Sequence, residues 1–235
     1  MVIAGLQDIF TTLIAASALL AAIMGIVVLE RFFHDKLKEL FNDSNYLIFF
    51  FLVIGYILYS IGEIALYLIE VVIDKPSFPG ISDVYWVGGA FFILVSFMAL
   101  TFHLIKNNPG SKISTLSIIG IILVALVLFV LFGVTLGTSG HFLNYFYPIM
   151  SALIVTFGLS VIFFSSYIGN LSQPLFLFLL ASLFILIGDV FYTYTLAESV
   201  YGFAGLVADM AYLSGYLLSF IAFVTFRLHI HKLNQ

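Results

Sequence analysis

Seven long apolar runs dominate the chain, and none of them alternates regularly between apolar and polar positions. A helix that crosses the hydrocarbon core of a bilayer needs about 20 apolar residues, whereas a spanning β-strand is about half as long and alternates in polarity. The runs therefore predict an all-α membrane protein. Its seven transmembrane helices are expected at about 9–33, 46–73, 83–105, 113–135, 143–168, 174–198 and 203–228.

The connections between these runs are too short to form a soluble domain, so residues 1–235 are predicted to be one membrane domain. Hydrophobic residues make up 63% of the chain and charged residues 9%, against about 45–50% and about 25% in soluble domains. We therefore expect a multi-pass protein of the cell membrane that has the lipid bilayer as a partner. The chain has no cysteine, which excludes disulfides and thiolate chemistry.

The basic residues predict the orientation in the membrane. All Lys and Arg residues except Lys75 lie in or beside the connections after the first and third runs, or near the C-terminus. Short cytoplasmic loops carry an excess of these residues. The N-terminus is therefore expected outside and the C-terminus in the cytoplasm. Because the basic residues are scattered, no nucleic-acid partner is predicted.

The chain also repeats itself at a constant offset of 126 residues. The matched positions include Glu63 with Asp189, Asp83 with Asp209, Gly89 with Gly215 and His103 with His229. Acids are costly in lipid, so two carboxylates that are matched in both halves indicate a two-fold site. Gene duplication alone would explain the matched apolar positions, but it would not explain why the acids are retained.

The offset spans four helices and so preserves helix direction, which predicts a parallel 3+1+3 arrangement. Repeat one is expected at about 9–108, a linker helix at about 113–135, and repeat two at about 143–235. The first helix is matched to the fifth through Ser17-Ala18-Leu19 and Ser151-Ala152-Leu153.

The acids and nearby aromatic residues of the outer half are the candidate site. Glu63 is expected about 15 Å inside the outer end of its helix, and Asp189 at the same depth. The predicted ligand- or ion-binding residues are Glu63, Asp83, Asp189, Asp209, Tyr67, Trp86, Tyr192 and Tyr212. No Lys or Arg is predicted in the outer half of a helix. The acids must therefore be protonated, hydrogen-bonded to Tyr or Ser, hydrated, or bound to a cation.

Each of these residue types also has a purely structural interpretation. Asp83 follows Ser82 at a helix start, where it would serve as an N-cap. The aromatic residues would form an interfacial belt, which is their usual position in membrane proteins. Glu70 lies near an outer helix end and is expected to face water.

Enzymatic chemistry is not predicted. Zinc needs three or four ligands within reach of one another, but His103 and His229 are expected about 30 Å from Asp83 and Asp209 along their helices. No Ser, His and Asp share a depth, which argues against a nucleophilic triad. The sequence therefore predicts no catalytic residues, no metal site and no cofactor.

Two families share features with these segments. Seven helices with Asp83 on the third and Asp209 on the seventh resemble a microbial rhodopsin, in the segments Ser82-Asp83-Val84-Tyr85-Trp86 and Val207-Ala208-Asp209-Met210-Ala211. Leu213 stands where that family carries its retinal lysine, and no helix contains a lysine at mid-membrane depth. The resemblance therefore implies no retinal Schiff base.

The segment from Phe78 to Tyr85 is similar to a Pro-Ser-x-Ala-Asp segment of the seven-helix sensor modules that precede histidine kinase or GGDEF output domains. The segments Ile187-Gly188-Asp189-Val190 and Gly205-Leu206-Val207-Ala208-Asp209 are similar to the later half of those modules. This resemblance implies ligand sensing and a cytoplasmic signalling partner, although the chain itself has no output domain. Parallel 3+1+3 repeats also occur in SWEET-type sugar transporters.

Three functions follow as expectations. The first is a receptor or sensor-like protein that binds a small ligand or cation in an acidic, aromatic-lined cavity open to the outside. The second is a small proton- or cation-coupled transporter built on the two repeats, and the third is a structural membrane subunit. The sequence does not identify the ligand, the coupling ion or the oligomeric state.

Overall fold

The computed structural model describes residues 2–33, 44–75, 78–107, 112–135, 141–164, 171–198 and 201–233. The described residues form helices and no strands. Seven of the helical segments are long and apolar enough to cross a membrane. They are Gly5–Arg31, Leu47–Val72, Ile81–Lys106, Ser114–Gly133, Phe142–Phe163, Ser172–Leu196 and Phe203–Leu228. The all-α class is confirmed for the described residues, as are seven helices with the length and apolarity of membrane spans.

The helices follow the predicted order with small differences at their ends. They are α1 (Val2–Phe33), α2 (Ser44–Tyr67), the π-helical turn η2 (Leu68–Val72), α3 (Ile81–Asn107), α4 (Lys112–Thr135), α5 (Phe142–Gly158), α6 (Ser160–Phe163), α8 (Ser172–Glu198) and α9 (Phe203–Leu233). The third helix begins two residues earlier than predicted, which places Asp83 in its first turn. From the first turn, Asp83 accepts a hydrogen bond from the N–H of Gly80, the residue before the helix.

The predicted fifth helix, 143–168, is interrupted at Leu159, between α5 and α6. The hydroxyl of Thr101 on α3 lies within hydrogen-bonding distance of three oxygens, namely the carbonyl oxygens of Phe97 at 2.8 Å and Phe157 at 2.9 Å and the hydroxyl of Ser160 at 2.9 Å. A side chain that bonds into the backbone ladder is a recognised cause of such an interruption. Residues 165–168 of the predicted helix lie outside the described part of the chain.

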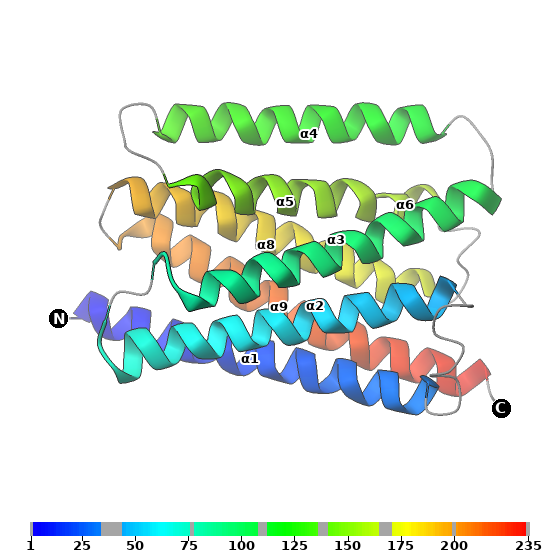
Figure 1. Cartoon of the computed structure of the whole chain (residues 1–235), viewed down its shortest axis with the longest axis horizontal. Helices are drawn as coiled ribbons and strands as arrows, with labels where there is room; N and C mark the ends of the chain where they lie inside the picture. Colours follow the sequence, from blue (N-terminus) through cyan, green and yellow to red (C-terminus); the bar gives the residue numbers. More distant parts are fainter. Residues whose placement is uncertain are drawn as a thin grey trace.

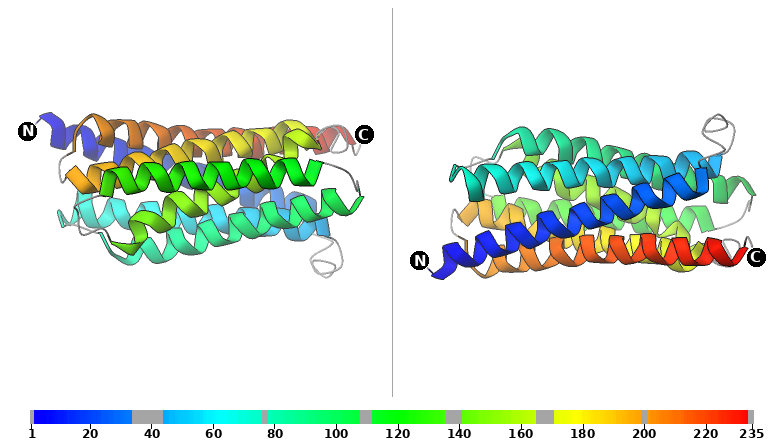
Figure 2. Two further views of the ribbon diagram at one scale, coloured as in Figure 1. Left: turned by 90° about the horizontal axis from the view of Figure 1, so that it is seen from above. Right: turned by 90° about the horizontal axis from the view of Figure 1, so that it is seen from below.

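The contacts between six of the described helices form a closed ring. The long helix α4 lies along the outside of the bundle (Figures 1 and 2). Around the ring the order is α1, α2, α3, α5, α8 and α9, and α9 packs against α1. The two most extensive contacts are those of α2 with α3 and of α8 with α9. The outer helix α4 packs on α5 and α8 and appears at the top of Figure 1.

Glycines allow close approach within these two extensive contacts. A Cβ added at Gly89 would lie 2.5 Å from a ring carbon of Tyr59 and 2.9 Å from the carbonyl oxygen of Gly55. A Cβ at Gly215 would lie 2.9 Å from the side chain of Ile185 and 3.2 Å from the carbonyl oxygen of Ala181. The two sets of three residues are related by the 126-residue offset. The α2–α3 and α8–α9 contacts are therefore made by corresponding positions.

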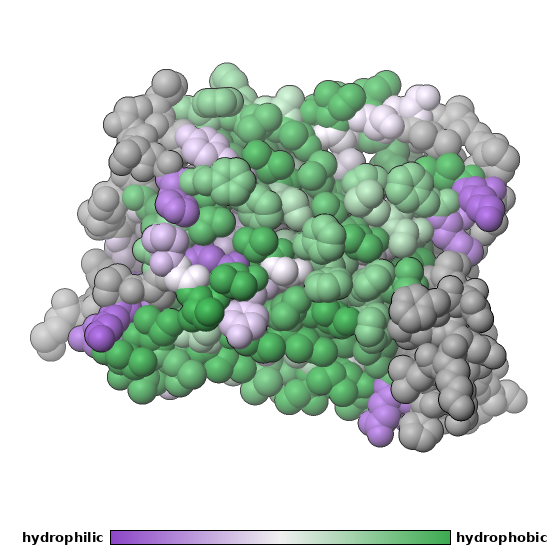
Figure 3. All heavy atoms as spheres, in the orientation of Figure 1, coloured by the Kyte–Doolittle hydropathy of each residue, from purple (hydrophilic) through white to green (hydrophobic). Residues whose placement is uncertain are grey.

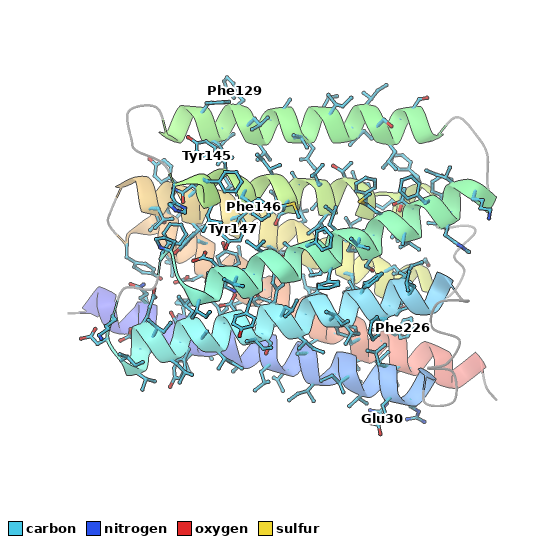
Figure 4. All side chains as sticks on the ribbon, viewed as in Figure 1. Glu30, Phe129, Tyr145, Phe146, Tyr147 and Phe226 are labelled. Carbon is cyan, nitrogen blue, oxygen red and sulfur yellow. The ribbon has the colours of Figure 1, made fainter. Side chains whose placement is uncertain are left out.

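The surface of the bundle is mainly apolar. Hydrophobic side chains cover the middle of the face in Figure 3, and hydrophilic ones lie mostly towards its ends. On α4, Phe129 is 80% exposed and points away from the bundle (Figure 4). An apolar exterior of this extent is suited to contact with lipid.

Candidate functional site

A cavity of about 480 Å³ lies among the helix ends on the side of the bundle where α1 begins. Residues of α1, α2, η2, α3, α5, α8 and α9 line it. Its carboxylates are Glu63, Glu70, Asp189 and Asp209, and its aromatic residues are Tyr59, Phe78, Trp86, Tyr147, Tyr192, Tyr201, Tyr212 and Tyr216. No Lys, Arg or His is among the described residues that line it.

Glu63 reaches the cavity from the last turns of α2 and is only 6% exposed. The hydroxyl of Tyr216 on α9 donates a hydrogen bond to Oε1 of Glu63 at 2.7 Å. The neighbouring Gly62 gives room for Trp86 of α3, because a Cβ at Gly62 would lie 2.7 Å from the indole nitrogen. That buried indole N–H interacts with Glu63 without hydrogen-bonding geometry and is among the buried atoms without a partner. Glu63 is thus held between α9 and α3.

Asp189 occupies the corresponding position on α8 and is 8% exposed. The hydroxyl of Tyr212 on α9 donates to its Oδ1 at 2.9 Å, and the hydroxyl of Ser151 on α5 donates to its Oδ2 at 2.5 Å. A Cβ at Gly188 would lie 2.6 Å from the ring of Tyr212. Both oxygens of this acid therefore have a donor, as a buried carboxylate requires.

The surroundings of Glu63 and Asp189 correspond in detail. Each acid follows a glycine, and an aromatic ring from 23 residues later in the chain packs on that glycine. The ring is that of Trp86 beside Glu63 and that of Tyr212 beside Asp189. Tyr212 and Tyr216 lie one turn apart on α9, so they share a face of that helix. One helix therefore supplies a hydroxyl to each of the two buried acids.

Asp209 lies in the second turn of α9 and is partly exposed. The hydroxyl of Tyr201, just before α9, donates to its Oδ2 at 2.5 Å. Partial burial and the bond to the acid raise the pKa of Tyr201 above its ordinary value, so its hydroxyl remains a donor at neutral pH.

Asp83 does not line the cavity, although it was predicted to belong to the site. It is 5% exposed, its Oδ2 accepts the N–H of Gly80 at 2.6 Å, and its Oδ1 accepts the hydroxyl of Tyr147 at 2.7 Å. It is the third residue of α3 and bonds back to the residue before the helix, as the acid of a capping box does. The interpretation of Asp83 as the N-cap residue is also corrected. Because α3 begins two residues earlier than predicted, Asp83 lies in the first turn of the helix.

Tyr67 was predicted to belong to the site and Glu70 to face water, and the structure differs from both predictions. Tyr67, one turn after Glu63, does not line the cavity, whereas Leu66 and Glu70 do. These two residues lie three and seven positions after Glu63 and follow the same helical face. The helix also widens to a π-helical turn at Leu68, which changes the direction of the residues that follow. Glu70 is therefore not simply a water-facing acid.

Six of the eight predicted residues thus line the cavity, and their role in ligand binding stays a prediction. The main residues that the prediction missed come from other helices: Tyr147 and Ser151 from α5, and Gln7 and Thr11 from α1. The only sequence feature that singled out Ser151 was its match to Ser17 between the first and fifth helices. Ser17 itself bonds to the carbonyl oxygen of Ile14 and is not a lining residue. Only the packing of α5 on α8 brings Ser151 to Asp189.

The basic residues lie mainly at the opposite end of the bundle. Arg31 lies in the last turn of α1, Lys106 lies in the last turn of α3, and Arg227 lies near the end of α9. Lys75 is exposed near the cavity end. The described part of the chain does not include His34, Lys36, Lys38, Asn108 and Asn234, nor the side chains of Lys112, His229 and Lys232.

No protein-family model matches the chain, and no curated protein or solved structure was found to be similar to it. The resemblances to sensor modules and microbial rhodopsins therefore rest on the short segments quoted above.

Proposed function

We propose that this protein is a receptor or sensor-like membrane protein that binds a small ligand or cation in the cavity between Glu63, Asp189 and Asp209. The single observation that carries the proposal is the cavity itself. Its volume of about 480 Å³ is in the range of small-molecule sites, roughly 300–1,000 Å³. It joins apolar walls to a few carboxylates that already have oriented donors, and such polar groups give a site its specificity.

Packed aromatic residues lie between the cavity and the basic end of the bundle, and this packing supports binding over free passage. Tyr56, Phe178 and Phe223 fill the middle of the ring, and each is less than 2% exposed. The rings of Phe178 and Phe223 have centroids 4.7 Å apart. The distribution of basic residues supports an orientation in which the cavity opens to the outside and the C-terminus lies in the cytoplasm.

Ligand binding has a route to a conformational change through the bond between Tyr216 and Glu63. This bond joins α9 to α2, which belong to the two proposed repeats. A ligand that competes for Glu63 would change the free energy of that contact and so the packing of one repeat against the other. In this proposal a cytoplasmic partner senses the change.

Access from the outside is testable because the chain has no native cysteine. Thr195→Cys is expected to react with a membrane-impermeant thiol reagent in right-side-out vesicles, because Thr195 lines the cavity and is partly exposed. Ala222→Cys is the buried control, since Ala222 is 0% exposed in the core and is not a lining residue. Labelling is measured by mass spectrometry. A Thr195→Cys variant that reacts only in inverted vesicles, or no faster than Ala222→Cys, would show that the cavity does not open outward.

Transport is the second candidate, and the ring of helices favours it. The contacts of α1 with α2, α2 with α3, and α1 with α9 have counterparts in α5 with α8, α8 with α9, and α5 with α3. This arrangement supports a parallel 3+1+3 repeat with α4 as the linker helix. Two repeats around one site are the usual architecture of alternating access.

A flux measurement separates the two candidates. For a receptor, proteoliposomes that enclose a pH-sensitive dye should show no more proton uptake under an inward proton gradient than protein-free vesicles. The reason is that the packed aromatic residues close the path beyond the cavity. Proton uptake that disappears in the Glu63→Gln variant would instead establish the transporter.

A further inference from the structure

We infer that the ligand of this cavity is an organic ammonium, a cationic nitrogen carried on a small apolar or aromatic body. This inference rests on the proposed function and specifies the chemical class of its ligand. Three independent properties of the cavity support it: its charge, its shape and the composition of its walls.

The charge of the lining is one-sided. Glu63, Asp189 and Asp209 line the cavity, and no Lys, Arg or His is among its described lining residues. A carboxylate in a membrane-embedded site is stabilised by a cationic partner, because the low dielectric strengthens their attraction. Tyr216 bonds Oε1 of Glu63, and because each carboxylate oxygen can accept more than one hydrogen bond, Glu63 can still accept an ammonium N–H. An ammonium group supplies both the positive charge and the donor.

The shape of the site does not suit a bare metal ion. The cavity measures about 480 Å³, whereas a coordinated metal needs ligands about 2–2.6 Å from a single point. Among the described residues, no group of three or more His, Asp or Glu side chains is placed to hold a metal ion. The acids are instead distributed over α2, η2, α8 and α9, around a space that holds a molecule.

The lining residues suit both the cationic nitrogen and the apolar body of such a molecule. Tyr59, Trp86 and Tyr192 present aromatic rings, and cations bind over ring faces with about 0.5–2 kcal/mol of stabilisation. Ile14, Leu66 and Ile185 provide apolar surface for a hydrocarbon body.

Trp86 is the only tryptophan of the chain, so its fluorescence reports on the cavity directly. The full-length protein in lipid nanodiscs is titrated with phenethylamine and with tetramethylammonium, each expected to cause a saturable change in emission. The neutral isostere 2-phenylethanol is expected to bind about 30-fold or more weakly than phenethylamine, because it cannot pair with the carboxylates. Glu63→Gln should weaken phenethylamine binding by a similar factor.

The matched control is Glu30→Gln, because Glu30 is exposed on α1 at the opposite end of the bundle from Tyr147 (Figure 4). This variant should bind phenethylamine with unchanged affinity. A thermal unfolding curve for each variant establishes that it is folded, and Asp209→Asn provides a second cavity variant if Glu63→Gln is unstable.

Each other outcome has a distinct meaning. Equal affinity for phenethylamine and 2-phenylethanol would overturn the ammonium assignment and indicate a neutral ligand. A response to sodium or calcium chloride alone, with none to either ammonium probe, would assign an inorganic cation and overturn the inference while leaving the proposed binding function intact. Silence towards every probe also overturns the inference. The proposed function fails separately if Thr195→Cys is inaccessible from the outside.

Discussion

Replacing Glu63 by glutamine is expected to remove most of the pH dependence of Trp86 fluorescence while changing the free energy of unfolding by about 1 kcal/mol or less. The indole of Trp86 lies on Gly62, next to Glu63, so its emission senses the charge of that carboxyl group. Glutamine keeps the shape and an oxygen that accepts the hydroxyl of Tyr216, but it has no proton to exchange. Emission spectra from acid to alkaline pH and a thermal melt measure the two effects.

Three variants make this result specific. Asp83→Asn tests the other acid that is close to Trp86 in the sequence. Tyr147 donates a hydrogen bond to Asp83, and the ring centroids of Tyr147 and Trp86 lie 6.3 Å apart. Asp189→Asn should have a smaller effect, because the ring that lies beside Asp189 is Tyr212. Glu30→Gln should have none, since Glu30 is exposed at the other end of the bundle. If Glu63→Gln retains the full pH response, Glu63 does not titrate beside Trp86, and its functional interpretation is wrong.

Adding one methyl group at Gly89 is expected to destabilise the protein by about 1–3 kcal/mol, the usual effect of overpacking a dense interface. A Cβ at this position would lie 2.5 Å from the ring of Tyr59 and 2.9 Å from the backbone oxygen of Gly55. The backbone oxygen cannot move away without separating α3 from α2. The Gly89→Ala variant should therefore unfold at a lower temperature than the native protein in the same detergent.

Two other glycines calibrate that effect. At Gly215, the corresponding residue of the α8–α9 contact, the new methyl group would lie 2.9 Å from the side chain of Ile185 and 3.2 Å from a backbone oxygen, and both distances are longer than those at Gly89. Gly215→Ala should therefore be less damaging than Gly89→Ala. Gly133 on α4 has nothing within 4 Å, so Gly133→Ala should be neutral or slightly stabilising through helix propensity. Equal stability of all three variants would show that close glycine contacts do not hold the helix pairs together.

The dense α2–α3 and α8–α9 contacts have a consequence for how the site works. Each contact brings an aromatic residue of the second helix onto the glycine beside an acid of the first. The acids are therefore fixed relative to their own helix pair, and the bond from Tyr216 to Glu63 joins one pair to the other. If the two pairs move relative to each other on ligand binding, this bond is where the cavity senses that movement.

The sequence by itself determined the number of membrane spans and most of their limits. Length and apolarity are local properties of a segment in lipid, because every backbone polar group must be satisfied within the helix itself. The main error in the helices occurs at Leu159, where the hydroxyl of Thr101 from another helix bonds to the backbone near the break. No local pattern around Leu159 reveals that partner.

The sequence also identified most of the acids of the cavity, since a carboxylate within an apolar run is unusual enough to be noticed in isolation. The matched Glu63 and Asp189 are both buried in the cavity lining. The matched Asp83 and Asp209 are not equivalent in the structure. Asp83 bonds to Gly80 and to the lining residue Tyr147 but does not itself line the cavity, whereas Asp209 does.

Only the tertiary structure decided which side of each helix faces inward and which donors meet the acids. In lipid, both the buried side and the lipid-facing side of a helix are apolar, so the polarity pattern carries little information about its rotation. Tyr216 meets Glu63 because α9 packs in the same ring as α2, and Ser151 meets Asp189 because α5 packs on α8. These pairs are 153 and 38 residues apart in the chain. Their meeting depends on the packing of the whole bundle, which the local sequence around each residue does not contain.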